Sequence, residues 1–385
     1  MNYRLKHSRS KEALSNSTQI LILNAIITVF VGFVVIILSV NGAINRRDFL
    51  KFSATCAAGI GAVPFSRTRN QPASDQMIRV AIPSISVYSE PSDESRIQYQ
   101  HYRDDLVNFY YEVNSPHGPD YNPHWYRVWG GYMHSAHLQK VATILNPVMD
   151  NIPETGVLSE VSVPFTQVMW LKGKKYWEPL YRLYYKSLHW VDGKQEGPDG
   201  EIWYRIHDEL LDNIRYFVRA EHLRQVPLQL FSPIDADFPD GNKRIEVVLA
   251  TQTLTAYRGN EIALQTKISS GLPDYSSSPG VISTNTPPGD FKVYSKMPSK
   301  HMGDGKLTSD LDAYELPGVP WSTFFAPNGI AFHGTYWHDN YGVPMSHGCI
   351  NMKPEEANWI FRWTMPRAIG DKIEQTGNGT HVTVI

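Results

Sequence analysis

A histidine and a cysteine that could act together flank a turn-rich stretch near the C-terminus. His333 and Cys349 are 16 residues apart, and their midpoint, Tyr341, lies in the strong turn signal HDNYG. A chain reversal at this turn would bring the two side chains together. A cysteine attacks as the thiolate, and a neighbouring imidazole can accept its proton and stabilise the resulting ion pair. The pair therefore favours a cysteine acyltransferase or peptidase.

The residue before the cysteine fits this chemistry. Gly348 allows a tight turn and lets backbone N–H groups point at a developing oxyanion, where one donor is typically worth about 10²–10³ in rate. Two alternatives stay open. A structural hairpin with a buried thiol is one, because a free cysteine often behaves as a small hydrophobe. A zinc site is the other, although no known ligand spacing is repeated; its ligands would be His333, His338, His347 and Cys349.

The composition limits the protein class. A chain of 385 residues predicts two or three domains, and 42% hydrophobic with 19% charged residues is typical of globular proteins with real cores. The net charge of -2 argues against nucleic acid as a main partner. Abundant aromatic residues, Gly and Pro favour short strands and turns. The only cysteine besides Cys349 is Cys56, so a disulfide framework is excluded.

The N-terminal region is predicted to direct export. A basic tail, residues 1–19, precedes the segment Ile20–Val40, which has 21 residues without a charge and is long enough to cross a bilayer with its N-terminus inside. The stretch NRRDFLKFSATCAAGIGAVPF at 45–65 resembles a twin-arginine export signal. We therefore interpret 20–66 as a transmembrane or export region and 67–77 as a linker. No lipidation is expected at Cys56.

The two export signals conflict, because a span with its N-terminus inside would leave the twin arginines outside. A start codon downstream of the first 40 or so residues would resolve the conflict, and we favour it; alternatively, residues 20–40 anchor the chain in the membrane and the arginine match is chance. Either way the chain is expected outside the cytoplasm, in the cell envelope, anchored to the membrane or associated with the wall.

The middle of the chain repeats itself. Residues 78–145 and 155–228 both carry a Tyr-Arg, a β-rich run, a Gly-Pro-Asp turn and a Trp-Tyr-Arg, with Trp125 and Trp203 separated by 78 residues. Short alternating strands predict two small antiparallel barrels. Both units resemble bacterial SH3-like domains, which implies cell-wall binding or positioning of a catalytic domain. The alternative is that the aromatic residues only fill two small cores.

Residues 240–385 are predicted to form a third domain. Two strands around a turn at Arg258–Asn260, a strand within 286–296, a helix over 352–365 and a closing strand indicate a mostly-β domain with one short helix.

The stretch HGTYWHDNYGVPMSHGCINM resembles the signature of the L,D-transpeptidase (YkuD-like) catalytic domain, a His-Gly followed by Ser-His-Gly-Cys. TPPGDF at 286–291 and VPW at 319–321 resemble other segments of that family. The resemblance implies a β-sandwich, no metal and no cofactor. It implies a nucleophile, Cys349, a base, His333, a carbonyl at Gly334 that orients the imidazole, and an oxyanion region at Ser346, His347 and Gly348. Substrate contacts are expected at Asn351, Trp321 and Thr335, and His338 receives no role.

The implied substrate is a peptidoglycan stem peptide. Cys349 would form a thioester with a tetrapeptide stem and release terminal D-alanine, and an amine of a second stem would complete a 3→3 cross-link. Water or a protein amine as the acceptor would instead give an L,D-carboxypeptidase or a wall-anchoring transferase. A non-catalytic wall-binding protein is the remaining alternative. Wall endopeptidases place Cys before His, and sortases separate the two more widely.

Overall fold

The computed structural model describes residues 76–385 apart from 174, 211–213, 274–283, 304–314 and 371. The predictions for the basic tail, the segment Ile20–Val40, the twin-arginine match and Cys56 lie outside these residues. Among the helices that are described, none is long and apolar enough to cross a membrane.

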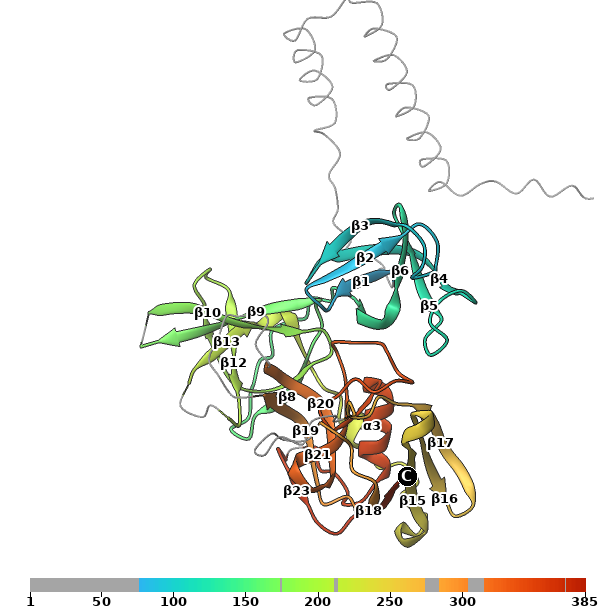
Figure 1. The fold of residues 1–385 in the computed structure, drawn as a ribbon. Coiled ribbons are helices and arrows are strands. Elements are labelled where there is room, and N and C mark those ends of the chain that lie inside the picture. Colours follow the sequence, from blue (N-terminus) through green and yellow to red (C-terminus); the bar gives the residue numbers. More distant parts are fainter. Residues whose placement is uncertain (1–75, 174, 211–213, 274–283, 304–314, 371) are drawn as a thin grey trace, which may run out of the picture. The chain divides into compact units, whose positions relative to one another are not determined.

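The two repeated units form sheets with the same strand order. The first sheet runs β3-β2-β6-β5-β4-β1-β7 and the second β10-β9-β13-β12-β11-β8-β14, so each strand of one has a counterpart seven numbers later. Figure 1 labels most of these strands, in blue to green colours for the first unit and in green for the second. The first contains β1 (Met77–Val80), β2 (Ser84–Tyr88), β3 (Ile97–Tyr102), β4 (Leu106–Asn114), β5 (His124–Val128), β6 (Gly131–His134) and β7 (Leu138–Val141). The second contains β8 (Val157–Val161), β9 (Phe165–Lys172), β10 (Tyr176–Tyr184), β11 (Leu188–Glu196), β12 (Ile202–His207), β13 (Tyr216–Arg219) and β14 (Leu223–Gln225). Duplication of one unit would produce this match; an SH3-like barrel stays a prediction.

The repeated Gly-Pro-Asp and Trp-Tyr-Arg motifs touch each other in both sheets. A Cβ on Gly118 would lie 2.5 Å from Nε1 of Trp125, and one on Gly197 would lie 2.1 Å from Cδ1 of Trp203. Both indoles are buried. A glycine is therefore required at each turn because a side chain would collide with the ring, which explains why the two motifs recur together.

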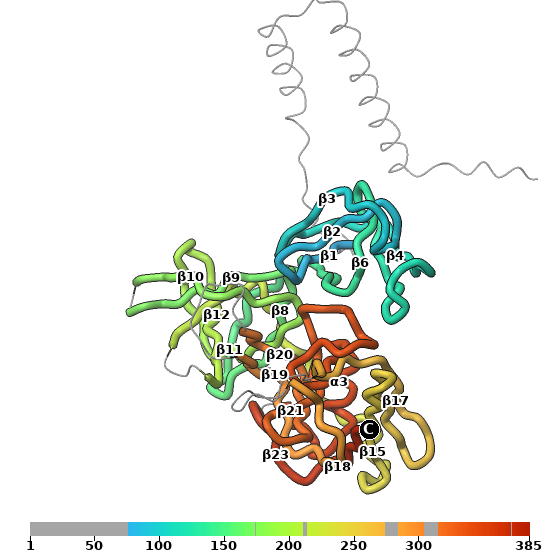
Figure 2. The backbone as a smooth tube through the Cα atoms, viewed as in Figure 1, coloured from blue at the N-terminus to red at the C-terminus, as the bar shows by residue number. Residues whose placement is uncertain are grey.

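The C-terminal domain has two five-stranded sheets and one described α-helix. One sheet has the order β17-β16-β15-β24-β18 and contains β15 (Lys243–Val248), β16 (Thr253–Arg258), β17 (Glu261–Lys267), β18 (Gly289–Lys292) and β24 (His381–Val384). The other has the order β22-β21-β20-β19-β23 and contains β19 (Ser295–Gly303), β20 (Glu315–Ala326), β21 (Ile330–Gly334), β22 (Ile350–Met352) and β23 (Gln375–Thr376). The first and last strands, β15 and β24, pair in parallel, and Figure 2 shows β15 beside the C-terminus. The mostly-β class with one short helix is confirmed.

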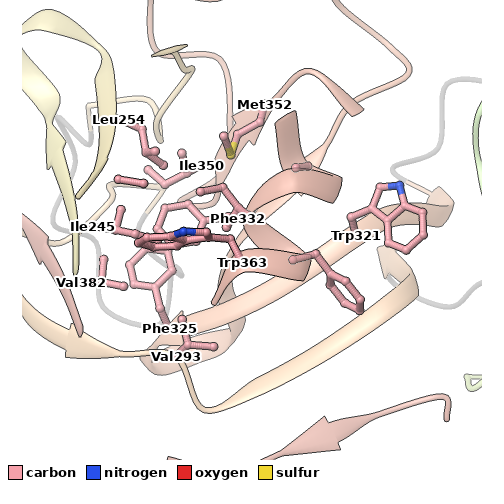
Figure 3. Packing of buried hydrophobic residues seen from close by; sticks show 14 of the residues in the cluster. Ile245, Leu254, Val293, Trp321, Phe325, Phe332, Ile350, Met352, Trp363 and Val382 are labelled. Atoms are coloured by element: carbon pink, nitrogen blue, oxygen red, sulfur yellow. The ribbon is translucent and has the colours of Figure 1, made fainter. Parts of the chain in front are cut away.

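Helix α3 (Pro354–Trp363) packs its apolar face into the core of this domain. Pro354 begins the helix and Glu355 and Glu356 lie in its first turn, as expected at the positive end of the helix dipole. The core joins both sheets and the helix (Figure 3), and its labelled members include Ile245, Leu254, Val293, Phe325, Phe332, Ile350, Met352, Trp363 and Val382. Burying each such side chain contributes about 1.5–3 kcal/mol, which fixes β21 and β22 against the helix.

Two buried lysines donate hydrogen bonds to the carbonyl groups at the C-terminal end of α3. Lys296 Nζ donates to the carbonyls of Phe361 and Thr364 at 2.6 and 2.5 Å, and Lys243 Nζ donates to that of Trp363 at 3.2 Å. The last carbonyls of a helix have no partner within it, and cations are favoured there. Burial lowers the pKa of Lys296 well below its ordinary value.

Candidate active site

The segment between His333 and Cys349 is not a hairpin. Strands β21 and β22 pair in parallel, with His333 opposite Asn351. Parallel strands need a crossover of a dozen or more residues, and the long loop 335–349 returns the chain to the same end of the sheet. A reversal centred on Tyr341 would have made the two strands antiparallel, so that part of the sequence-based prediction is wrong.

The parallel register still places the histidine and the cysteine on one face. Side chains alternate along a strand, and neighbouring strands lie about 4.8 Å apart. Asn351 lies beside His333, and Cys349, directly before β22, packs against Ala331, which is two residues before His333 on β21. His333, Cys349 and Asn351 line a common pocket of about 330 Å³.

The pocket wall comes from two domains. The C-terminal domain contributes His333, Trp337, His338, Met345, Ser346, His347, Cys349, Asn351, Met302 and Leu316. The first repeated unit contributes Ala81, Ile82, Arg103 and His137. No pattern in the sequence indicated that the first unit reaches this site.

His333 is held with one ring nitrogen available. Its ring is buried and packs against Trp337 at 5.8 Å between centroids. Nδ1 lies 3.0 Å from the carbonyl oxygen of Gly334. A carbonyl only accepts, so Nδ1 carries the proton and Nε2 keeps a free lone pair in the neutral ring. Gly334 cannot be another residue without displacement, because a Cβ there would lie 2.8 Å from Cα of Pro354.

The loop before Cys349 is fixed by two hydroxyl groups. Ser346 Oγ donates to the carbonyl of Cys349 at 2.5 Å and accepts from the N–H of Gly348 at 3.2 Å. Thr286 Oγ1 donates to the carbonyl of Gly348 at 2.8 Å. Gly348 has φ +114, which a side chain would strain. Its N–H, expected in the oxyanion region, is thus engaged by Ser346, whose role here is to shape the loop.

Residues 242–384 match the YkuD family, the L,D-transpeptidase catalytic domain. L,D-transpeptidase 1 of Mycobacterium tuberculosis is 31% identical over 151 residues, which are 36% of this chain and 53% of that protein. The chain thus spans about half the length of the curated relatives it matches.

Solved structures give similar matches. A mutant L,D-transpeptidase of Enterococcus faecium is 27% identical over 37% of this chain and 50% of its own, with a TM-score of 0.27. The catalytic domain from an E. faecium L,D-transpeptidase is 26% identical over 38% of this chain and 98% of its own, also with a TM-score of 0.27.

Burial favours the neutral forms of both His333 and Cys349. Burial lowers the pKa of His333 to about 4, although the bond to Gly334 opposes the shift. Burial raises the pKa of the Cys349 thiol to about 11, opposed by the backbone of Ala331. An ion pair would shift both values the other way. The structure thus favours a thiol beside an imidazole rather than the ion pair expected from the sequence.

Alkylation of Cys349 by iodoacetamide should reveal this resting state. The thiolate fraction of a thiol with a raised pKa grows tenfold per pH unit, so the rate is expected to climb about tenfold per unit from pH 7 to pH 9. The rate would be followed by intact protein mass, with Cys349→Ala as the blank. A rate that is already flat across this range would show a preformed ion pair.

Two expected substrate contacts are not brought to this pocket. Trp321 is 5% exposed and packs in the core, with ring centroids 5.5 Å from Phe231 and 5.2 Å from Phe361. Thr335 bonds Tyr341 OH at 2.6 Å and lines a second cavity of about 820 Å³. His338, which had no role from the sequence, lines both cavities.

The remaining predicted residues lie at the pocket. His347 is exposed there, and Asn351 is buried, with its backbone bonded to Ser269 at 2.8 and 3.0 Å. In the part of the chain that the structure describes, no three His, Cys, Asp or Glu side chains gather as a metal site requires.

Proposed function

We propose that this chain is a peptidoglycan L,D-transpeptidase that acts through a thioester on Cys349. The observation that carries the proposal is the pocket that Cys349, directly before β22, shares with His333, whose Nε2 is left free by the bond of Nδ1 to Gly334. The match of residues 242–384 to the L,D-transpeptidase catalytic domain supports it, as does the similarity to L,D-transpeptidase 1 of M. tuberculosis.

The first half-reaction forms the thioester. The Cys349 sulfur attacks the carbonyl carbon of the third residue of a tetrapeptide stem, at the L-centre of its diamino acid, while His333 Nε2 accepts the thiol proton. The C–N bond to terminal D-alanine then breaks, and the leaving amine takes the proton from the imidazolium. His333 ends neutral and Cys349 acylated.

The second half-reaction releases the enzyme. The side-chain amine of a second stem attacks the thioester carbonyl, loses a proton to His333 and forms a 3→3 amide, and the departing sulfur regains that proton. Water as the acceptor would give a tripeptide and L,D-carboxypeptidase activity, and a protein amine would anchor that protein to the wall.

The proposal extends to the rest of the chain. The two repeated units would be SH3-like domains that bind wall or position the catalytic domain, and the protein would work in the cell envelope after export. A non-catalytic wall-binding protein is the rival function. The intact pair of His333 and Cys349 in one pocket favours the enzyme.

Purified chain and its Cys349→Ala variant would be mixed with a disaccharide-tetrapeptide. We expect a protein adduct, D-alanine and a cross-linked dimer with the wild type and none of them with the variant, because no other described thiol exists. Intact-mass and product analysis would report all three. An adduct with tripeptide only would identify a carboxypeptidase, and products from the folded variant would refute the nucleophile.

A further inference from the structure

A histidine and an asparagine meet in the wall of the pocket. His338 is 5% exposed and Asn351 is 1% exposed. Nδ2 of Asn351 lies 2.8 Å from Nε2 of His338, and the backbone N–H of Asn340 donates to Nδ1 of His338 at 3.2 Å. Oδ1 of Asn351 is buried and has no hydrogen-bond partner.

The protonation state of His338 determines which atom of the Asn351 amide can form a hydrogen bond with Nε2. Burial, together with the nearby His137 and His333, lowers the pKa of His338 to about 3, so the ring is neutral and carries one N–H. Nδ1 accepts from Asn340, and the proton therefore sits on Nε2. An amide NH₂ facing an Nε2–H would oppose two donors and leave the amide oxygen without a donor.

Rotating the Asn351 amide by 180° removes both the clash of two donors and the missing donor to Oδ1. The two ends of an asparagine side chain have nearly the same shape and are distinguished by their partners. With the amide turned, Oδ1 accepts from Nε2–H of His338, and the NH₂ takes the place where the oxygen had no donor. Asn351 lies opposite His333 and lines the same pocket, and its turned NH₂ would be a buried donor without a partner in the wall of that pocket.

We propose that His338 is a positioning residue: its Nε2–H holds Oδ1 of Asn351, and Nδ2 of Asn351 is thereby presented as a donor to a carbonyl oxygen of the peptide in the pocket. The substrate part of this inference rests on the proposed function. The orientation of the amide rests only on the hydrogen bonds around His338.

The tautomer of His338 tests the orientation directly. The full chain with ¹⁵N-labelled histidine would be examined by long-range ¹H–¹⁵N correlation, with His338→Phe used to assign the signal. We expect the Nε2–H tautomer between pH 6 and 8. A proton on Nδ1 would overturn the proposal, because Oδ1 of Asn351 would then lack its donor.

A double-mutant cycle tests the route by which His338 acts. Acylation of Cys349 by imipenem would be timed in wild type, His338→Phe, Asn351→Ala and the double variant, with the exposed His381→Gln as the control. We expect each single variant to be slowed tenfold or more, and the double variant to be no slower than Asn351→Ala. If the rate losses of His338→Phe and Asn351→Ala multiplied in the double variant, the two residues would act independently, and the proposal that His338 acts through Asn351 would be overturned.

The two proposals can fail separately. A wild-type chain that shows the Nε2–H tautomer but is neither acylated by imipenem nor active on the disaccharide-tetrapeptide would refute the proposed function and leave the amide orientation standing. An active chain with the Nδ1–H tautomer would refute the positioning role alone.

Discussion

Replacement of His333 by glutamine is expected to slow acylation of Cys349 by a tetrapeptide donor by about 10²–10⁴-fold, the range that general-base catalysis contributes. With a thiol pKa of about 11, very little thiolate exists near pH 7, so the attack depends on proton transfer to Nε2 of His333. Glutamine can keep a bond to the carbonyl of Gly334 but has no basic nitrogen. The measurement is the rate of adduct formation by intact mass under single-turnover conditions.

Two controls separate lost base catalysis from lost structure. His381→Gln changes an exposed histidine on β24 and should leave the rate unchanged. Above about pH 11 hydroxide ionises the thiol without help, so iodoacetamide should alkylate Cys349 equally fast in wild type and His333→Gln. A loss of acylation smaller than tenfold would mean that another group accepts the proton.

The parts of the site that the sequence predicted are those fixed by local patterns. His333 and Cys349 share a pocket, the carbonyl of Gly334 bonds the imidazole of His333, and Gly348 has a backbone conformation that favours glycine. These residues all lie within one short segment of the chain, so their types and spacing can be read without knowing the fold. The mostly-β class and the helix at 354–363 follow from alternation and helix-start signals in the same way.

The parts that the sequence could not predict depend on long-range packing. The parallel pairing of β21 and β22 comes from the sheet and core around them, not from the turn signal at Tyr341. Trp321 was expected at the substrate, but aromatic neighbours from elsewhere in the chain bury it. The neutral state of His333 and Cys349 follows from burial, which spacing alone does not reveal.

A buried arginine links the first repeated unit to the active-site segment. Arg79, on β1, is 2% exposed; its guanidinium donates to Oδ1 of Asp104 at 2.9 Å and to the carbonyl of Tyr336 at 3.0 Å. Asp104 also pairs with Arg182 of the second unit, and the guanidinium of Arg79 lies 4.0 Å from the ring centroid of Tyr184. Three domains therefore meet at one charge cluster.

Arg79→Met is expected to lower the free energy of unfolding by about 3–5 kcal/mol, as found when one partner of a buried ion pair is removed. The change leaves the carboxylate of Asp104 with Arg182 as its remaining ion-pair partner and deprives the Tyr336 carbonyl of a donor. Urea unfolding followed by tryptophan fluorescence would measure the loss. Arg224→Met removes an exposed pair with Glu160 and should cost less than about 1 kcal/mol.

A second substitution, at Asp104, shows which interaction of Arg79 accounts for the stability lost in Arg79→Met. Asp104 has φ +66, a conformation that asparagine tolerates, so Asp104→Asn removes the charge without forcing the backbone to move. If the main cost of Arg79→Met is the buried carboxylate left with Arg182 alone, Arg79→Met with Asp104→Asn should be more stable than the sum of the two single losses predicts, by about 1 kcal/mol or more. Additive losses would show that Arg79 acts mainly through its other partners, Gln139 and the carbonyl of Tyr336. Because Ala81 and Ile82, two and three residues after Arg79, line the pocket, either result identifies how the first unit is held against the residues around Cys349.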